Sequence, residues 1–212
     1  MPKIDNVEIH GLDRVFRTAK YPKAADTGSV NNDLTPGIRA CLTCKPGEGH
    51  DNALKGIVVL FDLTFSNKAW VEAERYHFLD FVSSQSTMHR IARFDLRRQC
   101  NRYVDERIIA IVQEKIDRYN AQEEKDPQLY LEILYNVPSG FELTAGMVTN
   151  YQQLKTIYRQ RRTHRLPDWQ MFCDWVESLP YAELITGGRG HGTAGKGCGG
   201  EGGEVNGCCE VS

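Results

Sequence analysis

The stretch GIVVLFDLTFS, residues 56–66, gives the clearest structural signal in this sequence of 212 residues. Its apolar run from Ile57 to Phe61 contains β-branched residues and is bounded by glycine on one side and polar residues on the other. Such a short, bounded run is typical of a buried β-strand. Two further strands are predicted over residues 7–12 and 141–147, and in the second of these apolar residues alternate with others.

Helices are predicted on both sides of these strands from apolar spacing and from their start signals. Asp105 is placed to cap one helix, Asn150 with Gln153 fits a capping pair, and Pro167 fits a first helical turn. The predicted helices cover residues 68–81, 105–119, 127–135, 150–162 and 167–179. The buried side of the first would consist of Trp70, Ala73 and Phe81. Strands and helices mix without a regular βαβ rhythm, which favours an α+β fold.

Composition and charge indicate an ordinary globular chain with a formal net charge of -2. No apolar run approaches the ~20 residues that span a bilayer, and the first residues lack a secretory layout. We therefore expect a cytoplasmic protein without a membrane segment. Residues 1–186 are expected to form one domain, and the Gly-rich residues 187–212 a flexible tail. The seven cysteines, an odd number, are expected to be free thiols.

Residues 75–103 concentrate hydroxyl, amide, imidazole and guanidinium groups in a region of weak periodicity. Gln85, His89, Arg90 and Arg102 are among them. Such groups can bind phosphate bidentately and hydrogen-bond a base or an isoalloxazine edge. A solvated basic loop explains the same composition equally well.

A second basic cluster lies on and just after the predicted helix over residues 150–162. Its members are Lys155, Arg159, Arg161, Arg162, His164 and Arg165. Arg161 follows Leu154 by seven residues and therefore shares the buried face of that helix. A buried guanidinium needs an anionic partner. A substrate phosphate would serve, and so would Asp168 or Asp174.

Two shorter motifs carry less information. The glycines of residues 47–52, GEGHDN, permit close backbone approach, and Asp51 is placed to cap a helix, but the pattern matches no known phosphate-binding loop. Cys41 and Cys44 have the spacing of a zinc ligand pair, which is only half a site, and His191 with the tail cysteines could complete it only by folding back. We therefore expect no metal.

Taken in order, these stretches resemble the flavin-dependent thymidylate synthase family, and the likeness covers most of residues 47–180. Gly49-His50 resembles the Gly-His segment of the family. The run QSTMHR at residues 85–90 resembles the Gln-x-x-Arg-His-Arg signature, and Arg102-Tyr103 resembles the pair that closes it. The last block of the family contains Pro, Thr, Asn, Leu, Arg and Trp in that order. It is similar to a series of residues in this chain, namely Pro138, Thr144, Asn150, Leu154, Arg161 and Trp169.

The resemblance implies a mostly antiparallel sheet packed with long helices, in a homotetramer whose sites are shared between chains. It implies transfer of a one-carbon unit from methylene-tetrahydrofolate to C5 of a dUMP-like pyrimidine deoxynucleotide, as a methyl or hydroxymethyl group, with FAD as hydride carrier and NADPH as reductant. Arg161 would be catalytic and would bind the nucleotide together with Gln85 and Arg102. The residues implied at the cofactors are His50, Asn52, His89, Arg90 and Asn150.

Departures from the family pattern keep two alternatives open. Met88 and Gln152 occupy positions where the family has arginines, and Arg102 lies two residues further along the chain than the family pattern requires. These changes favour a nucleotide-binding protein that kept the scaffold without the chemistry. A nucleic-acid-binding protein using the basic helix is the second alternative, which the near-neutral net charge disfavours.

Overall fold

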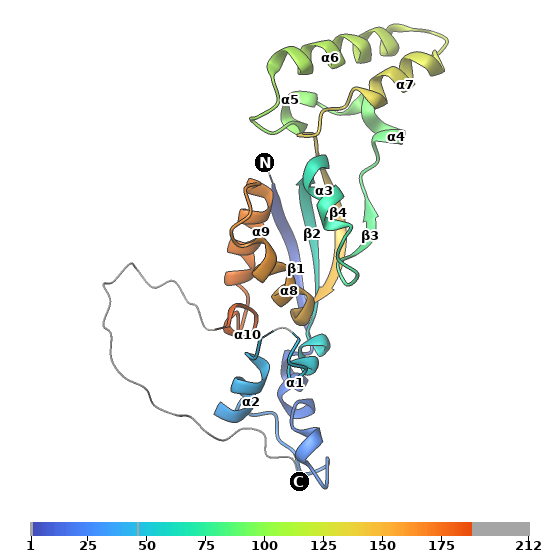
Figure 1. The fold of residues 1–212 in the computed structure, drawn as a ribbon. Helices are drawn as coiled ribbons and strands as arrows, with labels where there is room; N and C mark the ends of the chain where they lie inside the picture. Colours follow the sequence, from blue (N-terminus) through green and yellow to red (C-terminus); the bar gives the residue numbers. More distant parts are fainter. Residues whose placement is uncertain (1, 46, 188–212) are drawn as a thin grey trace, which may run out of the picture.

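The computed structural model describes residues 2–45 and 47–187, and its four strands form one antiparallel sheet (Figure 1). In the order β1-β2-β4-β3, the strands are Lys3–His10 (β1), Val58–Ser66 (β2), Glu142–Asn150 (β4) and Asp80–Ser84 (β3). The α-helices are Leu12–Thr18 (α1), Pro36–Leu42 (α2), Asn67–Ala73 (α3), Thr87–Arg90 (α4), Leu96–Gln99 (α5), Glu106–Ala121 (α6), Pro127–Tyr135 (α7), Tyr151–Arg161 (α8), Pro167–Glu177 (α9) and Glu183–Thr186 (α10). Short 3-10 helices occupy Tyr21–Lys23 (η1), Asn52–Gly56 (η2) and Ile91–Arg93 (η3). These elements confirm the predicted α+β fold with an antiparallel sheet.

The strand predicted from residues 56–66 lies inside the sheet. β2 pairs with β1 on one side and with β4 on the other. Phe61, Leu63 and Phe65 are almost fully buried, whereas Leu60 is 38% exposed. Successive side chains of a strand point to opposite faces, so the sheet buries one face and leaves the other open in this chain.

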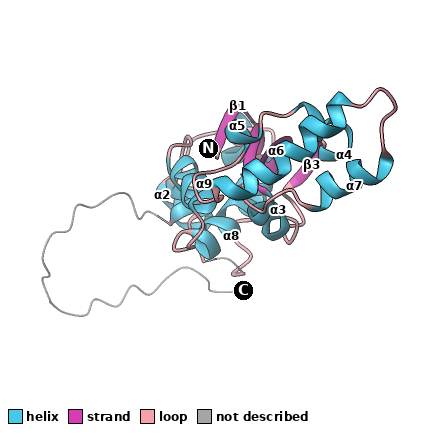
Figure 2. Ribbon diagram, turned by 90° about the horizontal axis from the view of Figure 1, so that it is seen from above, coloured by secondary structure: helices cyan, strands magenta, loops and turns pink. Residues whose placement is uncertain are grey.

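The chain forms two hydrophobic cores. The larger lies between the sheet and α3, α8 and α9, and there the rings of Phe65 and Trp169 are 5.0 Å apart. The smaller lies within the helical hairpin of α6 and α7 and includes Ile109, Ile133 and Phe141. The hairpin stands beyond one end of the sheet in Figure 1 and extends past β3, away from α2 and α9, in Figure 2.

Capping explains where the predicted helices begin, and four of these helices are confirmed as α6, α7, α8 and α9. Asp105 accepts a hydrogen bond from the backbone N–H of Arg107 at 2.8 Å at the start of α6. Asn150 accepts one from the backbone N–H of Gln153 at 2.9 Å at the start of α8. Pro167 occupies the first turn of α9. A backbone N–H at this position has no partner within the helix, so proline, which lacks that N–H, is tolerated there.

Two predicted elements differ from the structure. The helix predicted over residues 68–81 ends at Ala73, and Phe81 instead lies in β3, paired with Met147. Its ring still contacts Trp70, with the centroids 4.7 Å apart, so the two side chains pack together from separate elements. The first strand covers Lys3–His10 rather than residues 7–12, because Gly11 turns the chain directly into α1.

The loop predicted over residues 19–37 contains η1 and the start of α2. Residues 188–212, nearly all of the predicted tail, lie outside the described residues together with Cys198, Cys208, Cys209 and His191. Within the described part of the chain, no helix combines the length and the apolar character needed to cross a membrane.

Gly11 admits no side chain at the turn between β1 and α1. Its φ is +90°, and an added Cβ would lie 2.0 Å from the carbonyl oxygen of Gly56. The substitution Gly11→Ala is therefore expected to lower the free energy of unfolding by about 1–3 kcal/mol, measured by urea denaturation. Gly37→Ala is the matched control, since a Cβ there meets nothing within 4 Å, and its stability should stay unchanged or rise slightly. Equal losses in both variants would contradict this account.

Candidate functional site

A hollow of about 430 Å³ lies where β2 ends and α9 begins. An adjoining hollow of about 270 Å³ shares part of its wall and adds Arg102. The polar residues that line the larger hollow are Ser66, Lys68, Asn101, Tyr103, Ser139, Arg165 and Asp168. Its size lies within the range of small-molecule sites.

The side chains that line this hollow and the adjoining one carry a net positive charge. Asp168 is 4% exposed, and its carboxylate accepts a hydrogen bond from the backbone N–H of Ser66 at 2.9 Å. Lys68 and Arg165 contribute cationic groups to the lining, and Arg102 adds a third in the adjoining hollow. Three basic side chains thus accompany one carboxylate in the lining of the two hollows, and they are the groups available to an anion.

Burial raises the pKa of two titratable groups beside the hollow, Glu142 and Cys100. Burial raises the pKa of Glu142, which faces Ser66 across β2 and β4, and nearby Asp168 raises it further. Burial also raises the pKa of the Cys100 thiol to about 11. A thiol with a raised pKa is a weak nucleophile, so Cys100 offers no activated thiolate.

Arg161, the predicted catalytic residue, lies at the end of α8 with its side chain 11% exposed. Its Nη1 atom donates to Oε2 of Glu72 at 2.7 Å, and its Nε atom donates to the hydroxyl of Tyr76 at 2.8 Å. Its guanidinium carbon lies 4.7 Å from the ring centroid of Trp169 and 5.6 Å from that of Tyr76. The guanidinium is thus fixed by one ion pair and two aromatic faces.

The carboxylate that holds Arg161 was not among the partners predicted from sequence. Asp174 pairs with Arg162 at 3.2 Å, and Asp168 accepts its hydrogen bond from the end of β2. The partner is Glu72 on α3, which lies 89 residues earlier in the chain. Arg161 does pair with an internal carboxylate, as predicted, but the carboxylate is that of Glu72 and not that of Asp168 or Asp174. The sequence could not identify it, because no local pattern links α3 to the end of α8.

The Arg161 cluster adjoins the hollow. Oε1 of Glu72 lies 3.8 Å from Nζ of Lys68, which lines the hollow, and Arg165 lines it just after the end of α8. Arg102 lines the adjoining hollow. Of the three predicted nucleotide-binding residues, Arg102 thus lines the adjoining hollow, and Arg161 is linked to the larger hollow through Glu72 and Lys68.

Gln85, the third predicted nucleotide-binding residue, lies just after the end of β3. Its Oε1 atom accepts a hydrogen bond from the backbone N–H of Thr144 at 2.9 Å, and its own backbone N–H donates to the carbonyl of Thr144. Its amide nitrogen has no acceptor within residues 2–45 and 47–187 and remains able to donate to a ligand.

His89 and Arg90 lie on α4, which is attached to the helical hairpin by a hydrogen bond from the Tyr130 hydroxyl to the carbonyl of Met88 at 2.9 Å. Both side chains are exposed, and in the described part of the chain neither forms an ion pair. Other arginines of this region pair with carboxylates, namely Arg97, Arg98 and Arg107. Arg90 is therefore one of the guanidiniums that the fold leaves open to an anion.

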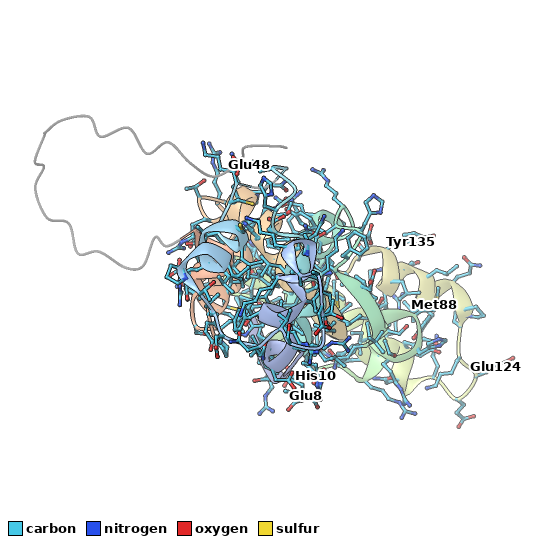
Figure 3. All side chains as sticks on the ribbon, turned by 90° about the horizontal axis from the view of Figure 1, so that it is seen from below. Glu8, His10, Glu48, Met88, Glu124 and Tyr135 are labelled. Carbon is cyan, nitrogen blue, oxygen red and sulfur yellow. The ribbon has the colours of Figure 1, made fainter. Side chains whose placement is uncertain are left out.

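The remaining predicted cofactor residues lie at the opposite end of the sheet. Asn150 faces Val58, whereas the hollow adjoins the pair of Ser66 and Glu142, and the intervening strand spans roughly 25 Å. Figure 1 shows this separation, with α4 beyond one end of the sheet and α8 toward the other. Figure 3, seen from below, shows Glu48 on the body of the chain and Met88 of α4 beside the hairpin. One chain therefore does not bring His50, Asn52 and Asn150 together with His89 and Arg90.

A buried network fixes the segment that carries His50 and Asn52. Nζ of Lys155 donates to Oδ2 of Asp51 at 2.9 Å and to the carbonyl of Leu42 at 2.9 Å. Nε2 of Gln152 donates to Oδ1 of Asp51 at 3.1 Å and to Oδ1 of Asn52 at 3.2 Å. Asp51 thus anchors the segment to α8. Its side chain makes no capping hydrogen bond at η2, so the prediction that it caps a helix was wrong.

The fit of this end to a flavin is partial. His50 and Asn52 are exposed, and the amide nitrogen of Asn52 has no acceptor among the described residues, so both can donate to a ligand. Oδ1 of Asn150 is engaged in capping α8. These residues can form one wall of a flavin site, which requires a second wall from elsewhere.

Cys41 and Cys44 are half-buried free thiols. Across residues 2–45 and 47–187, no three His, Cys, Asp or Glu side chains are arranged to hold a metal ion.

Comparison with solved structures identifies this fold in known enzymes. A thymidylate synthase X from Helicobacter pylori, crystallised with FAD and dUMP, matches with a TM-score of 0.64 at 12% identity, over 87% of this chain and 96% of that one. A second structure of that enzyme with FAD and dUMP gives a TM-score of 0.63 at 13% identity, over 86% and 96%. A UMP/dUMP methylase from Streptomyces cacaoi bound to 5-Br dUMP gives 0.58 at 15% identity, over 84% and 89%.

The sequence itself matches no known family model and no curated protein. The structural matches nevertheless extend over most of both chains. They show that this chain has the fold of the flavin-dependent thymidylate synthases, as the ordered sequence blocks predicted.

Proposed function

We propose that this chain is an enzyme that modifies a pyrimidine nucleotide at C5. The supporting observation is a hollow of about 430 Å³ lined by Lys68 and Arg165, in a fold shared with proteins crystallised with dUMP. Arg102 lines the adjoining hollow, and Arg161 is joined to Lys68 through Glu72. The proposed reaction transfers a one-carbon unit from methylene-tetrahydrofolate to a dUMP-like deoxynucleotide, as a methyl or hydroxymethyl group.

The basic groups around the hollow suit a nucleoside monophosphate. Lys68, Arg165 and Arg102 are available to bind phosphate oxygens. Arg161 is fixed in the adjoining cluster, and a guanidinium held in place can stabilise negative charge that develops on a pyrimidine ring without reorganising. Gln85 has a free amide nitrogen that suits a pyrimidine carbonyl or a phosphate oxygen.

The proposed cofactors are FAD, methylene-tetrahydrofolate and NADPH, with His50, Asn52 and Asn150 on one wall of the flavin site and His89 and Arg90 on another. Flavin, once reduced by NADPH, would supply the hydride that turns the transferred carbon into a methyl group; a hydroxymethyl product would take water at that carbon instead. Because the two walls lie toward opposite ends of the sheet in one chain, the proposal includes a homotetramer in which neighbouring chains supply them.

A nucleotide-binding protein without the chemistry is the second candidate. The hydrogen bonds from Gln152 to Asp51 and Asn52 favour it, since these polar groups of the proposed flavin wall are already bound to one another. A nucleic-acid-binding role is less favoured, because two cations of the basic cluster on α8, Lys155 and Arg161, are buried or nearly buried and paired with carboxylates.

Flavin binding separates the first two candidates. We expect the purified protein, reconstituted with FAD, to show a protein-bound flavin spectrum that shifts when dUMP is added, because the nucleotide and flavin walls meet in the assembled site. A spectrum identical to that of free FAD, combined with calorimetric binding of dUMP, would support the non-catalytic candidate. Absence of both flavin and nucleotide binding would contradict the proposed function. Uridine without its phosphate is the control ligand and should bind more weakly.

A further inference from the structure

Glu72 is the centre of the contacts that surround Arg161. Its Oε2 atom accepts hydrogen bonds from Arg161 at 2.7 Å and from Nε1 of Trp169 at 3.1 Å, and it lies 3.2 Å from Nε2 of His164. Its Oε1 atom lies 3.8 Å from Nζ of Lys68. One carboxylate thus joins α3, the end of α8, the following loop and α9.

The contacts of Arg161 leave one edge of its guanidinium open. Nη1 donates to Glu72 and Nε donates to Tyr76, while within the described ranges Nη2 has no acceptor. The planar guanidinium has five N–H donors in a fixed fork, so the two partners determine where the free edge points.

The charges around Glu72 do not balance. Arg161 and Lys68 contribute two positive charges, and Glu72 contributes one negative charge. Arg162, the next residue in the chain, is by contrast flanked by two carboxylates, those of Asp174 and Glu177. The Glu72 cluster therefore retains a net positive charge beside the hollow. The group formed by Arg162, Asp174 and Glu177 does not.

We infer that Glu72 is a positioning residue that orients Arg161 for the nucleotide, an inference that rests on the proposed function. Neither Glu72 nor Arg161 lines a hollow; both are connected to the larger one through Lys68, and Glu72 acts through the guanidinium that it holds. Tyr76 supports the same orientation, because its hydroxyl accepts from Arg161 and donates to Oε1 of Gln160 at 3.0 Å. A purely structural ion pair would hold α3 and α8 together without affecting the nucleotide.

A double-mutant cycle on the full chain distinguishes positioning from a structural role. The variants are Glu72→Gln, Arg161→Ala and the double substitution, and dUMP affinity is measured by calorimetry while urea unfolding is followed in parallel. Glu72→Gln should weaken dUMP binding about tenfold when Arg161 is present, and by less than about twofold in the Arg161→Ala background, where nothing remains to be oriented. Glu177→Gln, which removes a carboxylate of α9 that pairs with Arg162, is the matched control and should leave affinity unchanged.

Each outcome has a separate meaning. Equal weakening by Glu72→Gln in both backgrounds, or weakening that follows only the unfolding midpoint, would overturn the positioning role. Loss of binding in Arg161→Ala with no effect of Glu72→Gln would overturn it as well, while leaving the proposed function intact. Failure of the unsubstituted protein to bind dUMP would instead reject the proposed function.

Discussion

Replacing Lys155 with methionine is expected to lower the free energy of unfolding by about 3–5 kcal/mol. Lys155 and Asp51 are each 3% exposed, and their charged atoms are 2.9 Å apart. Methionine nearly fills the volume of lysine but leaves the Asp51 carboxylate in the interior without a counter-charge, and it removes the donor to the carbonyl of Leu42. An unpaired buried charge costs more than the pair contributed, so the loss should be large.

Urea denaturation followed by circular dichroism measures this loss. Lys115→Met is the matched control, because Lys115 pairs with Glu132 at the surface of the hairpin, and its loss should stay below about 1 kcal/mol. The double variant Lys155→Met/Asp51→Leu removes both charges and should recover much of the lost stability. Similar small losses in Lys155→Met and in the control would show that the buried pair does not anchor residues 51–56 to α8.

Replacing Arg161 with alanine is expected to weaken dUMP binding by about 10- to 100-fold, the range for losing a hydrogen bond to a charged group. The substitution removes the guanidinium that Glu72 joins to Lys68 of the hollow, and Glu72 keeps Trp169 and Lys68 as partners. The protein should therefore remain folded. Calorimetry measures the affinity, and a cooperative urea transition shows that the variant is folded at the temperature of titration.

Arg162→Ala is the control for this prediction. Arg162 neighbours Arg161 on the chain, yet its guanidinium pairs with Asp174 and Glu177 on α9. Its removal should change dUMP affinity by less than about twofold, since rim charges away from a ligand contribute little. Unchanged affinity in Arg161→Ala would reject the assignment of this arginine to the nucleotide site.

Much of the fold could be predicted from sequence because its signals are local. The apolar run of residues 56–66 became β2, and the spacing and caps of the later helices located α6 to α9. The prediction of a helix over residues 68–81 was wrong for the second half of that range. There the run containing Phe81 and Val82 pairs with β4, and strand pairing outweighed the helical spacing of apolar residues.

The candidate site was predicted less completely than the fold. Arg161 was placed on a buried face by its spacing from Leu154, and its side chain is 11% exposed. Glu72 was missed, since it lies on a short helix whose local pattern shows nothing unusual. Lys155 was taken as one base of a charged helix, although it is paired with Asp51 in the interior.

By itself the sequence determined β2 and the helices α6 to α9, because periodicity and capping act between residues a few positions apart. Only the tertiary structure decided which charges meet. Glu72 and Arg161 are separated by 89 residues, and Asp51 and Lys155 by 104, and each pair forms only when separate elements pack against α8. The same packing placed the two predicted flavin walls at opposite ends of β4, a separation that no local pattern encodes, because it depends on how the strands pair.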